Sequence, residues 1–190
     1  DFSKMPEVVL EGRRVVNNIQ TSASLFLVKN IFSILTTVFT LIAANLYPLY
    51  PTQLSLLGAF TIGTPAFVLA LQPNKELIRG DFLVNVILKA LPAGLADFIM
   101  LAAISIHGNI LGMSNEQIST VAIVILLFIG LAALVRICRP FDGIRILLCL
   151  AMAAGIVICV LNFKGIFAIT TVNMTMLRMI IMYALIAGGL

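Results

Sequence analysis

The sequence predicts an all-α membrane protein, a polytopic bundle of six transmembrane helices. Of its 190 residues, 61% are hydrophobic and only 11% are charged. The mean hydropathy of +1.14 is far above that of a soluble domain. The apolar residues stand in long continuous runs and do not alternate with polar ones, so the strands of a membrane β-barrel are not expected.

Six apolar runs approach or exceed the length of about 20 residues that a helix needs to cross a bilayer. They cover residues 23–47, 53–71, 83–107, 118–135, 144–163 and 172–190. We expect residues 1–20 to form a cytoplasmic linker and the start of a charged stalk helix. Residues 21–190 are then the transmembrane helical domain.

The basic residues predict the orientation of the chain. With a cytoplasmic N-terminus, ten of the twelve Lys and Arg residues, Lys29 among them, lie at or near cytoplasmic ends of the runs, and only Lys164 and Arg178 lie toward the other side. Six crossings then place the C-terminus in the cytoplasm as well. The net charge of +4 reflects this topology, and no basic surface typical of nucleic-acid binding is present in the sequence.

Polar residues inside the first two runs indicate a function. The first run carries Asn30 and Ser33, whose spacing places both on one face of a helix. In the second run, Pro65 cannot donate a backbone hydrogen bond to the carbonyl of Thr61, four residues earlier. A Gly-x-Pro break of this kind is tolerated in lipid only against protein or a wet cavity.

These groups predict a cation site between the first two spans. If the two helices face each other, Asn30, Ser33, Thr61 and the freed carbonyl form an all-oxygen cluster, which hard cations prefer. Broken helices whose loose carbonyls hold an ion at mid-bilayer recur in transporters. The alternative for Asn30 is a hydrogen bond between neighbouring helices.

Asp97 is the one acidic residue of the sequence inside a run, near the middle of the third. An ionisable group at this depth is costly and is therefore a functional candidate, here as a further metal ligand. The alternative is a protonated or hydrogen-bonded carboxyl with a packing role, close to a bend expected from Pro92 to Gly94.

Several short motifs in the first 74 residues match one protein family. They are Glu11-Gly12-Arg13, Asn17-Asn18, Asn30 twelve residues later, and the segment from Phe60 to Leu71. This stretch resembles the stalk and the fifth and sixth membrane helices of cation-transporting P-type ATPases. In its details it is similar to the bacterial, calcium-linked E-type group. The four later runs are compatible with helices seven to ten.

The resemblance implies the C-terminal transport part of an ATP-driven pump in a bacterial plasma membrane. In calcium pumps of this class an Asn of helix five binds the ion, and Asn30 occupies that place. The family's Glu three residues later is Ser33 here, and its Asn-x-x-Thr-Asp pattern retains only Thr61. Calcium is therefore the expected cation, with magnesium or a monovalent ion as alternatives because two carboxylates are replaced.

The resemblance also implies partners. Besides the lipid bilayer, these are the N-terminal helices and cytoplasmic domains of the same protein, which would supply the ATP- and Mg-dependent chemistry. No phosphorylated Asp motif or phosphate-binding loop stands in these 190 residues. The helix from about Glu11 to Lys29 is expected to transmit phosphorylation elsewhere to the membrane as a rigid lever.

A second function remains open from the residues alone. The chain could be a self-sufficient six-helix secondary transporter or channel, with Asp97 as its coupling or selectivity group. Internal repeats would favour this reading. None is visible in the sequence, because the break at Pro65 has no counterpart beside Gly155 in the fifth run.

Overall fold

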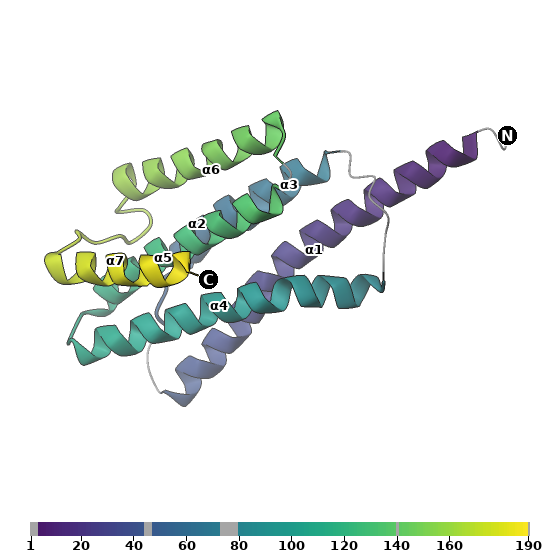
Figure 1. Ribbon diagram of the computed structural model, residues 1–190. Helices are drawn as coiled ribbons and strands as arrows, with labels where there is room; N and C mark the ends of the chain where they lie inside the picture. Colours follow the sequence, from purple (N-terminus) through teal and green to yellow (C-terminus); the bar gives the residue numbers. More distant parts are fainter. Residues whose placement is uncertain (1–3, 44–46, 73–79, 140, 190) are drawn as a thin grey trace.

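The computed structural model describes residues 4–43, 47–72, 80–139 and 141–189. Every regular element in these ranges is a helix, and no strand occurs in them. Among the described residues, five helical spans are long and apolar enough to cross a membrane, whereas the last helix is shorter, with 15 residues. The all-α membrane bundle predicted from the apolar runs is confirmed (Figure 1).

The first helix, α1, runs without interruption from Met5 to Ile42. Its 38 residues give a length of about 57 Å, whereas the hydrocarbon core of a bilayer is about 30 Å thick. Pro6 stands in the first turn, where proline is tolerated. The stalk and the first span are therefore one rod, and its N-terminal part extends beyond the rest of the bundle (Figure 1).

The second span consists of three consecutive helical segments. They are α2 from Pro51 to Gly58, a π-helical turn from Ala59 to Gly63, and α3 from Thr64 to Ala70. The N–H of Thr64 donates to the carbonyl five residues back. The break predicted at Pro65 thus takes the form of one widened turn and not of an unwound stretch. Single π turns inside α-helices occur frequently at functional sites.

Four further helices complete the described bundle. They are α4 from Phe82 to Ile110, α5 from Asn115 to Ile137, α6 from Gly143 to Asn162 and α7 from Met174 to Gly188. The last three begin at Ser114, Asp142 and Asn173, whose side chains accept hydrogen bonds from N–H groups of the first turn. The most buried span is α5, which contacts the second span, α4, α6 and α7.

Two glycines bring other helices close to the π-helical turn. A Cβ on Gly130 of α5 would lie 2.8 Å from the Cβ of Thr61, and a Cβ on Gly155 of α6 would overlap the ring of Phe60. Small residues at such points allow close packing of membrane helices. Because Phe60 and Thr61 both belong to the widened turn, α5 and α6 hold that turn in place.

Candidate functional site

A cavity of about 900 Å³ lies among α1, the second span, α4 and α5. Two of the predicted ligands, Thr61 and Asp97, line it together with Lys29. The fold therefore brings side chains from the first three apolar runs to one space inside the bundle. Its size lies in the range of ligand-binding cavities.

Thr61 lies in the π-helical turn and is 7% exposed. Its hydroxyl donates a 2.7 Å hydrogen bond to the carbonyl of Leu57 in the same span, and its methyl group rests against Gly130. A hydroxyl oxygen that donates its one proton still has lone pairs that accept. Thr61 can therefore offer an oxygen to a cation in the cavity while it keeps its own hydrogen bond.

Asp97 projects from α4 into the same cavity. Its Oδ1 atom is buried, and no donor among the described residues reaches it. A buried carboxylate oxygen without a partner costs free energy, so such groups are rare in folded proteins. The oxygen is therefore a site where a bound cation or water would be favourable. Within the described chain, no hydrogen bond to Oδ1 holds the carboxyl in a packing role.

Asn30 and Ser33 lie one turn apart on α1, as their spacing predicts, but neither lines the cavity. Asn30 is exposed and Ser33 is half-buried. Within the described ranges neither side chain takes part in a hydrogen bond, so the interhelical bond considered for Asn30 is not formed there. The four predicted ligands thus fall into two pairs, Thr61 with Asp97 on the cavity and Asn30 with Ser33 outside it.

Lys29 is a functional candidate that the sequence analysis missed. It was placed with the residues near the cytoplasmic boundary, whereas its Nζ atom lies 3.4 Å from where a Cβ of Gly58 would stand, near the middle of the second span. Among the described residues no carboxylate lies within 4.0 Å of this ammonium. The available signal was its position inside the first apolar run, where an ionisable residue is a functional candidate by default.

The described part of the chain lacks a cluster of acidic or other typical metal-binding side chains. Among the described residues, no group of three or more His, Cys, Asp or Glu side chains could hold a metal ion. Of the predicted ligands, Thr61 offers a hydroxyl oxygen and Asp97 a carboxyl oxygen on the cavity. Few charged ligands favour a weak site over a tight one.

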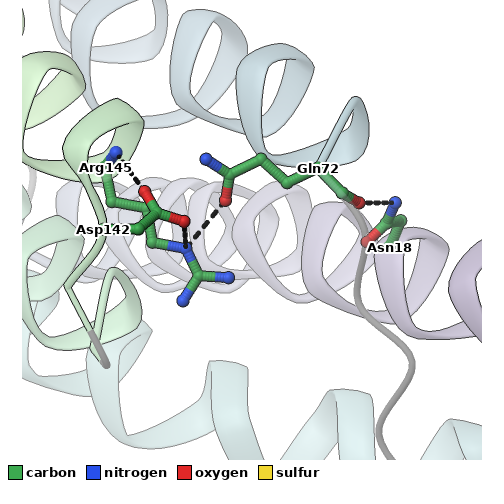
Figure 2. Close-up of polar contacts among 4 residues, drawn as sticks. All are labelled: Asn18, Gln72, Asp142 and Arg145. Atoms are coloured by element: carbon green, nitrogen blue, oxygen red, sulfur yellow. Dashed lines mark hydrogen bonds and ion pairs between the residues drawn. The ribbon is translucent and has the colours of Figure 1, made fainter.

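A chain of polar contacts joins α1, the end of α3 and the start of α6 (Figure 2). The side-chain amide of Asn18 donates to the carbonyls of Ala70 at 2.7 Å and Gln72 at 3.0 Å. Oε1 of Gln72 accepts from Nε of Arg145 at 2.7 Å, and that nitrogen lies 3.7 Å from Asp142. Carbonyls at a helix end lack partners within the helix. Asn18 therefore caps α3 from the stalk.

These observations define a multi-pass helical membrane protein with a cavity beside a π-helical turn, and Lys29, Thr61 and Asp97 line this cavity. No model of a known protein family matches the chain. It is 35% identical, over 163 residues and 82% of its length, to a probable cation-transporting ATPase, exp7, of Streptococcus pneumoniae. It is 36% identical, over 171 residues and 83% of its length, to the calcium-transporting ATPase CtpE of Mycobacterium bovis. With CtpE of Mycolicibacterium smegmatis the identity is 32% over 189 residues, 91% of the chain.

The chain belongs to the cation-transporting P-type ATPases and corresponds to a transmembrane part of them. It spans 21% of the length of the pneumococcal relative and 22% and 24% of the two mycobacterial ones. The resemblance inferred from residues 1–74 is thereby confirmed, and the similarity extends over most of the chain.

Proposed function

We propose that this chain is the transport part of an ATP-driven cation pump and that it binds the cation between its first two spans. The observation that carries the proposal is the placement of Thr61 and Asp97 on one cavity beside the π-helical turn. A hydroxyl oxygen and an unpartnered carboxylate oxygen are both ligands that hard cations accept. ATP hydrolysis, with its Mg²⁺, belongs to the rest of the full-length protein.

We propose that Asn30 and Ser33 bind the transported ion at a second position, on the face of α1 away from the cavity. Asn30 is exposed in this chain, and the relatives are four to five times longer. We infer that further helices of the full-length protein cover this face of α1. The amide and hydroxyl oxygens of the two residues then serve as ligands on that side.

Lys29 opposes a bound cation in this arrangement. Its ammonium and a cation beside Thr61 and Asp97 would share one cavity and repel each other. The side chain has a flexible four-carbon stem. We infer that the Lys29 side chain moves away from Gly58 when the cation binds. The ammonium of Lys29 and the cation then occupy the cavity in turn, and not together.

Calcium is the cation that we propose. Two of the relatives are calcium-transporting by name, and oxygen ligands of the hydroxyl, amide and carboxylate kinds suit calcium. Magnesium and monovalent ions are the competitors, because the described residues of the cavity include a single carboxylate.

We further propose a bacterial plasma-membrane location, as for the family, with both termini in the cytoplasm. The orientation follows from the distribution of Lys and Arg.

The stalk provides a route for coupling. α1 is continuous from Met5 to Ile42, and Asn18 ties it to the carbonyls at the end of α3. A displacement of the N-terminal part of α1 would therefore pull on α3 and, through it, on the π-helical turn that carries Thr61. Rigid elements of this kind transmit conformational change between domains.

The test is ion-dependent ATP hydrolysis and transport by the purified full-length protein, with calcium, magnesium, manganese, sodium and potassium compared. We expect calcium to stimulate hydrolysis, and calcium uptake into sealed vesicles to require ATP. Stimulation by another ion of the panel alone would refute calcium as the substrate. Transport that persists without ATP would favour the secondary transporter or channel that uses Asp97.

A further inference from the structure

Four basic side chains gather at one end of the cavity and define what we call the basic rim. They are Lys89 of α4, Arg136 in the last turn of α5, Arg139 just after it, and Arg145 in the first turn of α6. Asp97, the one acidic residue among the described residues that line the cavity, lies eight positions beyond Lys89 on α4, about 12 Å along the helix.

Three members of the basic rim have no partner in the part of the chain that the structure describes. Lys89, Arg136 and Arg139 are exposed and take part in no ion pair or hydrogen bond there. Arg145 already binds Gln72 and Asp142. Like charges that line one opening add to a strong positive potential. The end of the cavity at the basic rim therefore attracts anions and repels cations.

We propose that the basic rim binds the phosphate of an anionic phospholipid headgroup. Guanidinium groups match phosphate oxygens in a two-pronged geometry, and two of the three unpartnered members are arginines. Basic pockets between transmembrane helices bind anionic headgroups in membrane proteins. The inference goes beyond ion transport and stands whichever cation is carried.

Apolar side chains beside the basic rim favour a lipid over a soluble phosphate as the source of the anion. Leu88 is 64% exposed, Leu91 41% and Ile137 38%, and Ile137 itself lines the cavity. Ile144, next to Arg145, is 59% exposed. The phosphate would lie in the opening while the acyl chains cover these side chains. A soluble phosphate would leave them uncovered, although it offers the same charged oxygens.

The experiment uses the full-length protein in mild detergent, titrated with short-chain phosphatidylglycerol, with phosphatidylcholine of equal chain length, and with glycerol phosphate. Binding is followed by the rise in the unfolding temperature, read from the loss of helical circular dichroism on heating. The test variant is Arg136→Gln with Arg139→Gln. The control, Lys164→Gln with Arg178→Gln, removes the same charge from exposed positions that do not line the cavity.

We expect saturable stabilisation by phosphatidylglycerol and little by the other two compounds. The test variant should bind phosphatidylglycerol about tenfold more weakly, because each basic residue adds to headgroup attraction, and the control should bind as the parent does. If the double variant fails to fold, Lys89→Gln tests the same prediction with a smaller loss of affinity. The proposal is overturned by equal binding of the two lipids, by equal losses in variant and control, or by glycerol phosphate binding as tightly as phosphatidylglycerol.

Discussion

Gly130 and Thr61 pack against each other so closely that a Cβ on the glycine would lie 2.8 Å from the Cβ of the threonine. The contact joins α5, the most buried span, to the π-helical turn. Gly155 of α6 packs equally closely against the ring of Phe60, in the same π-helical turn. The position of the cavity hydroxyl thus depends on residues far along the chain.

Gly130→Ala should force Thr61 and α5 apart. Overpacking of this kind costs about 1–3 kcal/mol, so we expect a lower unfolding temperature of the full-length protein and weaker ion-stimulated ATPase activity. Gly143→Ala is the matched control, because nothing in the described structure lies within 4 Å of a Cβ there. Equal unfolding temperatures for the two variants would mean that the Gly130 contact is not tight.

Asn18→Ala should loosen the link between the stalk and α3. The variant leaves the carbonyls of Ala70 and Gln72 without their amide donor, at a cost of roughly 1–3 kcal/mol. We expect calcium-stimulated ATPase activity to fall more than calcium binding, because coupling and not the ion site is affected. Asn162→Ala is the control, since that amide donates to Ile158 of its own helix, at 3.2 Å, and to no other helix among the described residues. A fall in binding equal to the fall in activity would argue against a coupling role for Asn18.

Lys29→Met should strengthen cation binding, because it removes a positive charge from the cavity. For an ammonium and a divalent ion about 10 Å apart, at an effective dielectric constant of about 20, the repulsion is on the order of 3 kcal/mol, so the apparent calcium affinity should rise at least about tenfold. Lys164→Met, on an exposed residue outside the cavity, should leave it unchanged. Weaker binding in Lys29→Met would mean that the ammonium supports the site.

Gln53→Met should destabilise the start of α2, the N-terminal end of the second span. Gln53 is 0% exposed; it accepts from the N–H of Tyr50 at 3.1 Å and donates to the carbonyl of Ala168 at 3.2 Å. The variant leaves the N–H of Tyr50 and the carbonyl of Ala168 without this partner. Such a loss costs about 2 kcal/mol, which is measurable as a lower unfolding temperature. Gln117 forms the equivalent bond at the start of α5, to the N–H of Ser114 at 3.1 Å, but at an exposed site. Gln117→Met should therefore cost less, and an equal cost would show that burial of Gln53 is unimportant.

The helices could be predicted from the sequence because long apolar runs permit few alternatives. The second, third, fourth and fifth runs agree with the observed spans to within about three residues at each end, the usual uncertainty of helix boundaries. The first run belongs to a helix that begins much earlier, at Met5, because the charged segment before it contains no proline beyond the first turn. The sequence predicted a break of the helix at Pro65. The chain is helical through Pro65, and the irregularity is a π-helical turn from Ala59 to Gly63, directly before it.

The candidate site was less predictable, because it depends on contacts between distant residues. The widened turn is held by Gly130 and Gly155, which lie some 70 to 95 positions away from it in the sequence. Pairwise spacing placed Asn30 and Ser33 on one face of α1, but it carries no information on which face meets the cavity. Lys29, the residue before Asn30, lines the cavity instead. Its position beside Gly58 was missed because basic residues were assigned to the membrane boundary.

The most direct test of the proposed cation site is equilibrium binding of radioactive calcium to the full-length protein carrying Thr61→Ala or Asp97→Asn. Ser55→Ala is the matched control, because the Ser55 hydroxyl also bonds the carbonyl four residues back, at 3.0 Å, but at an exposed place on the same span. We predict that both cavity variants bind calcium at least about tenfold more weakly, a loss of about 1.4 kcal/mol, and that Ser55→Ala binds as the parent does. Unchanged calcium affinity in both cavity variants would contradict a cation site between the first two spans.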